Sequence, residues 1–281
     1  MVANKNQPRP SEKYEQDLLQ EINGMYDLAF KAKQKSQDQI PVVESKVVFS
    51  HGETLEYIFG LDGFASRFEE LSKQLPRSQV PFKIAEDVIY GRFGSFEDEE
   101  RALLAIRAGL GCMTPPGSTA APLEGITSVR LKENPDRSKY LAIYFAGPMR
   151  SAGGTEQALS ILIGDFVRSA LHLSKYMPTP EEIARFIEEH KLFQRKVSRF
   201  QYRTSEEQLL FVLQRMPIEV TGVGTDPFEV LTYKNLPRIE TNFIRGGALR
   251  VLIDGFIGRA EKVLKFVREL NLSGWDWLSE I

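Results

Sequence analysis

The sequence predicts an α+β fold, in which a mainly helical N-terminal region precedes a mixed α/β region. In the first part, apolar residues recur at helical spacing, and in the second, apolar strand-like runs alternate with capped helices. A length of 281 residues suggests about two domains. We expect a disordered lead at residues 1–11, the helical region at 12–115 and the α+β region at 116–281.

The helical region begins with an amphipathic helix over Glu12–Lys35, whose apolar residues fall on one face. The lead before it is polar and contains two prolines, which is typical of a disordered segment. A β-branched run at 40–49 predicts a short strand, and two or three short helices should follow between residues 54 and 90.

The next helix is expected to run from Ser95 to about Leu110. Ser95 is the predicted N-cap, and the acids from Glu97 to Glu100 stand in the first turn, where they interact favourably with the helix dipole. The same acids could be read as a metal-binding carboxylate cluster, but the dipole explains them without a metal.

The Pro/Gly/Ser-rich stretch Met113–Pro122 predicts the boundary between the two regions. A hairpin should follow, with strands at 126–131 and 140–145 around a polar turn at 134–138. Its second strand, YLAIYF, is apolar throughout and is expected in the centre of a sheet.

Helices and a strand pair complete the expected architecture. A helix at 155–173 is apolar on most faces and should be buried. Thr179 opens a second helix with a capping box, and Thr204 and Ser205 cap a third. Two strands around 218–221 and 228–233 are expected to pair, and a long helix should run from about residue 246 to 270.

Composition limits the classes of protein that fit. The net charge is −2, so contact with nucleic acid would need a local basic patch. No apolar run approaches the ~20 residues that span a bilayer, and the N-terminus lacks the apolar core of a secretory signal, so we expect a cytoplasmic protein without membrane contact. Cys112 is the only cysteine and the three histidines have no ligand spacing, so we predict no metal site on this chain.

The segment Gly147–Thr155, GPMRSAGGT, lies between the central strand and the buried helix. Its glycines allow backbone conformations closed to other residues, and Thr155 is placed to cap the helix. A helix N-terminus after glycines suits an anion, and an arginine fork suits phosphate. A tight turn that binds nothing explains the pattern equally well. The candidate phosphate contacts here are Arg150, Ser151, Gly153, Gly154 and Thr155.

The stretch KLFQRKVSRFQYR, residues 191–203, carries five cations and no acid. Three aromatic residues are interleaved with them, a mixture seen in single-strand platforms. We expect the aromatics to pack into the core, whereas the charges are equally consistent with phosphate contact and with a solvated helix end. The candidates are Lys191, Arg195, Lys196, Arg199 and Arg203.

A third segment, Leu236–Arg250, repeats the first pattern more weakly, with Arg245 before Gly246 and Gly247 at another helix start. We include Arg245 as a candidate phosphate contact. No paired carboxylates suit the two metal ions of nucleotidyl transfer, and no nucleophile–base constellation is suggested, so no catalytic residue is predicted.

Two segments resemble the N-terminal region of the large subunit of archaeal family-D DNA polymerase. They are residues 120–164, which contain LAIYFAGPMRSAGGTEQALS, and residues 236–278, which contain LPRIETN and IRGGA. The helices between them and the N-terminal helix match more loosely, so the resemblance covers most of the chain.

The resemblance implies a replicative DNA-directed DNA polymerase that works as a heterodimer with a small subunit carrying 3′–5′ exonuclease activity. Its polymerase centre, a pair of double-psi β-barrels with an Asp-rich metal motif, lies downstream, as do its zinc modules. Magnesium and zinc are therefore expected in the rest of the large subunit and no cofactor on this chain, which we take as a fragment. The family's N-terminal region forms accessory domains, one of them KH-like.

Three functional hypotheses follow. In the first, the chain is an accessory region that positions primer-template DNA and braces the polymerase core, with the small subunit, the rest of the large subunit and the sliding clamp as candidate partners. In the second, it is a structural module that touches only protein. In the third, it is an enzyme that binds a phosphate ligand in the Gly-rich loop, which would need a general base that the sequence does not offer.

The purified chain should not extend a primer, because it lacks a recognisable two-metal carboxylate site. Incorporation of labelled nucleotides into a primer-template measures this. Template-dependent incorporation that persists after alanine replaces all of Glu97–Glu100, with no other subunit present, would contradict the accessory role.

Overall fold

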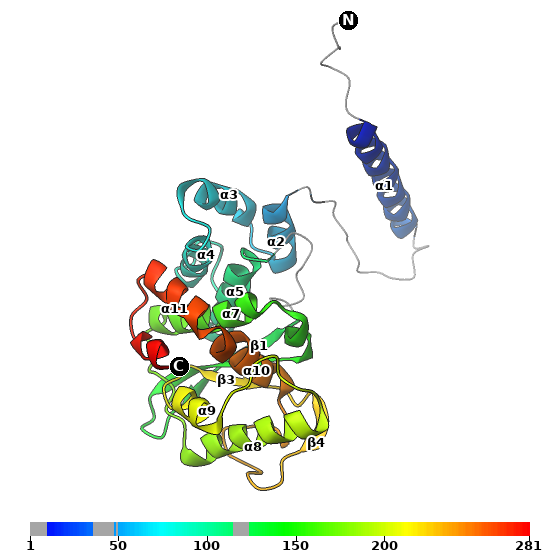
Figure 1. Ribbon diagram of the computed structural model, residues 1–281. Helices are drawn as coiled ribbons and strands as arrows, with labels where there is room; N and C mark the ends of the chain where they lie inside the picture. The colour runs from blue at the N-terminus through cyan, green and yellow to red at the C-terminus, as the bar shows by residue number, and fades with distance from the viewer. Residues whose placement is uncertain (1–9, 36–47, 49, 115–123) are drawn as a thin grey trace, which may run out of the picture. The chain divides into compact units, whose positions relative to one another are not determined.

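The computed structural model describes residues 10–35, 48, 50–114 and 124–281 (Figure 1). The chain divides into two compact units, Met1–Phe49 and Ser50–Ile281. In the first unit, helix α1 (Pro10–Gln34) confirms the predicted N-terminal helix. Most of the predicted lead, strand 40–49 and boundary stretch 113–122 lies outside the described residues, so these and the domain boundary stay predictions.

The second unit begins with four helices, which Figure 1 shows gathered at one end. They are α2 (His51–Phe59), α3 (Phe64–Gln74), α4 (Val80–Ile89) and α5 (Asp98–Gly111). The prediction that Ser95 caps the last of them is wrong, because the N-cap is Glu97 and no side chain caps it. Glu99 in its first turn accepts a hydrogen bond of 2.9 Å from the backbone N–H of Leu131, which ties α5 to the sheet.

The main sheet has the order β1-β2-β3, with β1 (Ile126–Glu133) antiparallel and β3 (Glu219–Gly222) parallel to β2 (Lys139–Phe145). Strand β2 is therefore central, as predicted, and six of its seven residues are buried. The predicted pairing of the last two strands with each other is wrong. β3 pairs with β2, whose two apolar faces favour a position between two strands, and β4 (Asp226–Glu229) pairs with β5 (Phe243–Ile244).

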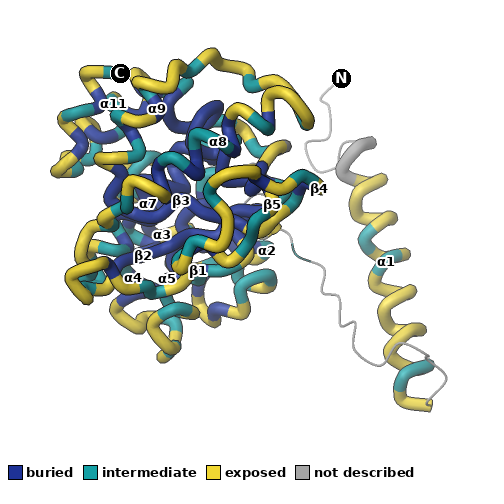
Figure 2. Tube along the Cα trace, turned by 90° about the horizontal axis from the view of Figure 1, so that it is seen from below, coloured by how far each residue is buried: buried dark blue, intermediate teal, exposed yellow. Residues whose placement is uncertain are grey.

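The crossover from β2 to β3 contains the short helix η1 (Gly147–Ser151) and three longer helices. These are α7 (Gly154–Ala170), α8 (Pro180–Lys196) and α9 (Glu206–Leu213). The capping box predicted at Thr179 is confirmed. Of the two residues predicted to cap the next helix, Thr204 and Ser205, the N-cap is Ser205, which forms a capping box with Gln208. Helix α7 is buried along most of its length and packs on α5 and β2, and Figure 2 shows it in the interior of the unit.

The chain continues through a series of helical segments in place of the single long helix that was predicted. These are α10 (Gly246–Arg250), the π-helical η2 (Val251–Phe256), η3 (Ile257–Arg259), α11 (Ala260–Glu269) and η4 (Asp276–Glu280). One hydrophobic core extends from Leu55 to Leu278, so the four helices and the sheet share it. The predicted fold class, α+β with a helical beginning, is confirmed.

A buried ion cluster joins α8 to the start of α10. The carboxylate of Glu189 accepts hydrogen bonds from Nε of Arg185 at 2.5 Å and from both the backbone N–H and Nε of Arg245 at 3.1 Å. Arg245 also donates to Oγ1 of Thr221 at 2.8 Å, and Arg185 donates to the carbonyl of Tyr233 at 2.8 Å. At most 2% of any of the three charged side chains is exposed, so removing one charge would leave the others uncompensated in the interior.

Replacing Glu189 with alanine should lower the free energy of unfolding by about 3–5 kcal/mol, because two buried guanidinium groups lose their counter-charge. Glu206, which pairs with Lys191 on the surface, is the control, and its replacement by alanine should cost about 1 kcal/mol or less. Urea denaturation measures both. Equal effects of the two substitutions would show that the cluster does not stabilise the fold.

Candidate nucleic-acid interface

The Gly-rich loop and the basic stretch meet around one hollow on the surface of the second unit. The hollow has a volume of about 590 Å³, and its walls come from residues 150–157, 193–201 and 250–259. Four arginines from these segments line it: Arg150, Arg199, Arg250 and Arg259. The structure thus brings together the first two sequence-predicted segments and adds Arg250, the last residue of the third, and the residues that follow it.

Arg150 follows the central strand, and three contacts hold its guanidinium group in place. Its guanidinium pairs with the buried carboxylate of Asp226, donates to Oγ1 of Thr225 at 3.1 Å and lies 5.7 Å from the ring centre of Phe193. One third of the side chain stays exposed. Arg150 therefore presents an oriented fork to the hollow.

Arg250 connects the helical segments to the loop after α8. It pairs with Asp254 one turn later and donates to Oγ of Ser198 at 3.0 Å and to the carbonyl of Arg199 at 2.8 Å. The Asp254 carboxylate in turn accepts from the backbone N–H of Gln201 at 2.8 Å. This pair sets the path of the loop that carries the candidate cations, and it lies where α10 passes into the π-helix, a geometry frequent at functional sites.

Gly154 is required for a reason other than the expected one. Neither Gly153 nor Gly154 is among the residues with positive φ, so the expectation of a special backbone conformation is wrong. Instead, a Cβ at Gly154 would lie 1.9 Å from Nε of Arg259, whereas a Cβ at Gly153 would meet nothing closer than 3.9 Å. Gly154 therefore leaves the space that the Arg259 side chain occupies.

One further expectation about the loop, that Thr155 caps the helix, changes with the structure. Helix α7 has Gly153 as its N-cap, so Thr155 stands inside the helix and accepts a hydrogen bond of 2.7 Å from Nζ of Lys262. Nε of Arg259 is buried without a hydrogen-bond partner in the described part of the chain, which leaves a donor at the wall of the hollow. The side chain of Ser151 is outside the described residues.

The cations of the basic stretch divide into two groups. Arg195, Lys196, Arg199 and Arg203 are exposed, and no acidic side chain within the described ranges pairs with them. Lys191 differs, because it pairs with Glu206 at 2.8 Å. Arg245 differs further: it is buried in the Glu189 cluster and has no surface to offer a phosphate, so we remove it from the candidate set.

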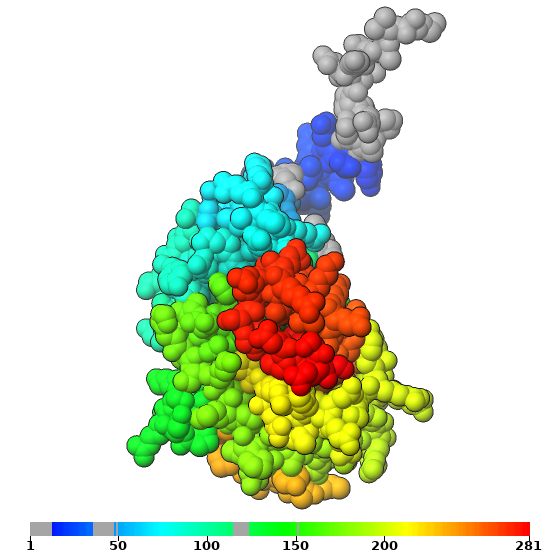
Figure 3. Space-filling model, turned by 60° about the vertical axis from the view of Figure 1, so that its left-hand side comes forward, coloured from blue at the N-terminus to red at the C-terminus, as the bar shows by residue number. Residues whose placement is uncertain are grey.

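Two more hollows flank the loop between α8 and α9. One, of about 520 Å³, is lined by Gln194, Arg199 and Phe200, and the other, of about 480 Å³, by Ile257–Lys262 and Ile281. Both are also lined by Tyr202, Arg203 and Thr204. Figure 3 shows the C-terminal segment (red) beside the segment that contains this loop (yellow). Five arginines line the three hollows, and Arg195 and Lys196 are exposed on the adjoining end of α8; we call these seven the basic surface: Arg150, Arg195, Lys196, Arg199, Arg203, Arg250 and Arg259. Lys262, which also lines the hollow of about 480 Å³, donates to Thr155.

One exposed carboxylate, Glu261, lines the hollow of about 480 Å³, whereas two acids beneath the basic surface are paired with arginines. Asp226 and Asp254 are buried and paired with arginines. Burial lowers the pKa of His190, which lies under Phe200, so its imidazole is neutral at pH 7. Burial also raises the pKa of Glu156, although the hydrogen bond from the N–H of Gly153 opposes this shift. The positive potential therefore comes from the arginines and lysine.

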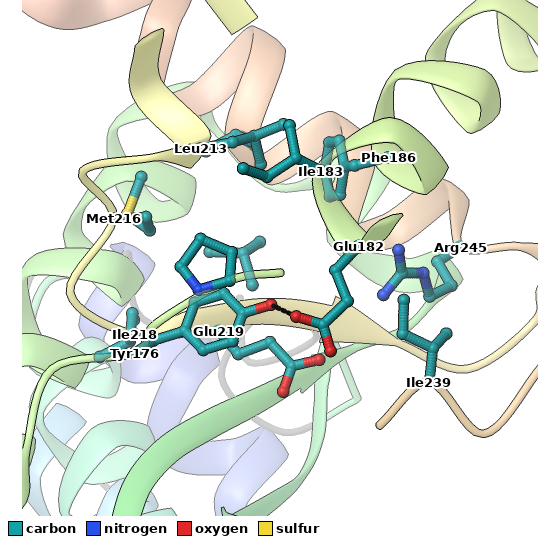
Figure 4. A pocket seen from close by; sticks show the side chains of 13 residues that line it. Tyr176, Glu182, Ile183, Phe186, Leu213, Met216, Ile218, Glu219, Ile239 and Arg245 are labelled. Carbon is teal, nitrogen blue, oxygen red and sulfur yellow. Dashed lines mark hydrogen bonds between the residues drawn. The ribbon is translucent and has the colours of Figure 1, made fainter. Parts of the chain in front are cut away.

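A separate pocket beside β3 is too small for a nucleotide. Its volume is about 30 Å³, which is enough for roughly one or two waters. Figure 4 shows apolar side chains on one side and Tyr176, Glu182 and Glu219 on the other, with the Tyr176 hydroxyl donating to Glu182 at 2.9 Å. This pocket belongs to the packing of the core.

Sequence reasoning missed Arg259 and left Arg250 out of its candidates. The pair Gly258-Arg259 inside an apparently continuous helix was the available signal, since a glycine within a helix often marks a break or a close approach. Within the described residues, no three acidic, histidine or cysteine side chains group as metal ligands, and no helix is long and apolar enough to cross a membrane.

Comparison with known proteins places the chain in a family. The sequence model described as DNA polymerase II large subunit DP2, N-terminal, matches residues 13–281. The chain belongs to this family. Proteins named DNA polymerase II large subunit are similar to it along almost its whole length, and it spans about a quarter of theirs.

Three relatives come from different archaea. The protein of Methanococcus maripaludis strain S2 is 41% identical over 268 residues, which are 95% of this chain and 24% of the relative. That of Methanothermobacter thermautotrophicus is 42% identical over 270 residues, 95% of this chain and 24% of the relative. That of Pyrococcus furiosus is 40% identical over 276 residues, 97% of this chain and 22% of the relative. The basic surface thus belongs to the N-terminal region of a polymerase large subunit.

Replacing Gly154 with alanine should displace the Arg259 guanidinium from the loop while the fold survives, because the flexible end of an arginine can move aside. The unfolding free energy should change by no more than about 1 kcal/mol. Gly153→Ala is the matched control and should leave Arg259 in place. Crystal structures of the two variants measure this, and an unmoved Arg259 in the first would contradict the close approach.

Proposed function

We propose that this region positions primer-template DNA through its sugar-phosphate backbone and braces the catalytic core of a replicative archaeal DNA polymerase. The name shared by the relatives supports the polymerase assignment. Nucleotide transfer with its magnesium is assigned to the rest of the large subunit, as are the zinc modules, and 3′–5′ exonuclease activity is assigned to a small partner subunit. The sliding clamp is a further candidate partner.

The observation that carries the DNA proposal is the convergence of cations from separate segments on one exposed, hollowed surface. Arg150 comes from the Gly-rich loop, Arg199 and Arg203 from the loop after α8, and Arg250 and Arg259 from the helical segments. Such an arrangement neutralises successive phosphates and holds a strand in position without reading its sequence.

The binding should be weak and of low sequence preference. Not every cation can face one strand, so two to four phosphate contacts are expected, with a Kd of about 10⁻⁴ to 10⁻⁶ M, as in non-specific association. In the whole enzyme, the weak affinity of this region for the primer-template would then add to the affinity of the catalytic core for the same DNA.

A second candidate function, contact with protein alone, is favoured by helix α1. Tyr14, Met25, Leu28 and Phe30 on this helix are each more than 60% exposed. Large apolar side chains exposed along one helix commonly mark a protein contact. The third hypothesis, an enzyme using the Gly-rich loop, has no comparable support, because Asp254 in the hollow is already bonded to Arg250 and to the loop.

Replacing Arg195, Lys196 and Arg199 together with alanine should weaken DNA binding similarly for every sequence and flatten its salt dependence. Each lost phosphate contact reduces the slope of log affinity against log salt by about 0.9 on duplex and 0.7 on single strands. The fold should survive, because exposed charges contribute little to stability. Fluorescence anisotropy with a labelled primer-template at several salt concentrations measures the slope.

A matched control replaces three exposed lysines that line none of the hollows, Lys73, Lys139 and Lys175. This variant has the same change in net charge and should keep the wild-type slope. Absence of binding by the wild-type chain at about 50 mM salt, or an unchanged slope in the arginine–lysine variant, would favour the protein-contact function.

A further inference from the structure

We propose that Tyr202 is a stacking platform for one unpaired base of a DNA single strand whose phosphates lie on the basic surface. The proposal rests on the DNA-positioning function above and specifies its ligand. It concerns the one aromatic side chain of the basic stretch that the structure leaves open to solvent.

The three aromatic residues of that stretch have different surroundings. Phe193 is 1% exposed and stacks on Phe200, with ring centres 4.9 Å apart and planes inclined by 23°. Both rings lie beneath Arg250, at 5.3 and 5.1 Å from its guanidinium. They therefore support the arginines. Tyr202 is 38% exposed, and no ring within the described residues stacks on it.

The Tyr202 ring is held in place although it is exposed. A Cβ on Gly258 would lie 2.3 Å from its Cδ2 atom, so the ring lies directly against a backbone that carries no side chain there. The guanidinium of Arg259 is 5.9 Å from the ring centre. The backbone N–H of Tyr202 also donates to Asp254 at 3.3 Å. A ring ordered in advance loses little conformational freedom when a base stacks on it.

Tyr202 borders two hollows, and each of them contains cations. Tyr202 lines the two hollows of about 520 and 480 Å³, each within the range of sites for small ligands and large enough for a single nucleotide. Arg199 stands in the first hollow, Arg203 in both, and Arg259 in the second, which Lys262 and the exposed Glu261 also line. The phosphate of a nucleotide in either hollow would therefore lie near a guanidinium.

A single strand fits this arrangement better than a duplex. In a duplex, the faces of the bases are covered by their neighbours, and only the edges are accessible in the grooves. An unpaired base offers its face, and stacking on an aromatic side chain contributes similarly for every base. The basic surface would then hold an unpaired stretch of template.

Anisotropy of the 281-residue chain with a labelled oligothymidylate of about 12 nucleotides and with a blunt duplex tests the proposal. Tyr202→Leu should weaken single-strand binding roughly 5- to 150-fold, the range that corresponds to removal of a stacking residue, and leave duplex binding unchanged. Tyr202→Phe should keep single-strand affinity within about twofold, because it keeps the ring. Tyr90→Leu, at a tyrosine that is 69% exposed and lines none of the three hollows, is the control.

A second readout separates stacking from a general loss of shape. An oligonucleotide with one 2-aminopurine should lose base fluorescence on binding to the wild-type chain and to Tyr202→Phe, but not to Tyr202→Leu. If Tyr202→Leu binds single strands as well as wild type while the Arg195/Lys196/Arg199 variant does not, the platform is overturned and the backbone-contact function stands. If the wild-type chain binds neither the single strand nor the duplex, the result contradicts both the stacking platform and the DNA-positioning function. Equal weakening for single strand and duplex also overturns the platform.

Discussion

The buried carboxylate of Glu189 is the contact on which the arrangement of the second unit depends. It holds Arg185 of its own helix and both the backbone and the side chain of Arg245, and these arginines reach β3 and the 233–241 loop. Three charges without water are tolerated only when each is paired and hydrogen-bonded. The cluster therefore specifies how α8 lies against the start of α10, and this in turn specifies where the loop after α8 begins.

The basic surface has two parts: an ordered base of aromatic rings and paired arginines, and the exposed cations around it. Phe193 and Phe200 lie beneath, Arg150 and Arg250 lie over Phe193, and their ion pairs with Asp226 and Asp254 fix the guanidinium directions. Exposed cations then surround this ordered base. Ordered arginines favour recognition of phosphate geometry, whereas mobile lysines would supply charge without direction.

Local signals predicted much of the fold. Thr179 and Ser205 cap their helices as the sequence indicated, because a capping box uses only neighbours in the chain. The apolar strand YLAIYF is central because both of its faces need cover. One error is local, because the N-cap of α5 is Glu97 and not Ser95. Another concerns distant segments, because β3 pairs with β2 and not with β4. Strand pairing depends on which edge is free, and no local pattern states this.

The sequence by itself determined the fold class, the family and the two segments rich in glycine and cations, since these are properties of consecutive residues. Only the tertiary structure decided which cations share a surface. Arg245 and Arg250 stand five residues apart, yet one is sealed in the core by Glu189 and the other lines the hollow. Arg259, far along the chain, reaches the loop because Gly154 leaves room for it. Burial and close approach depend on the packing of distant segments, which is why residue type and spacing did not reveal them.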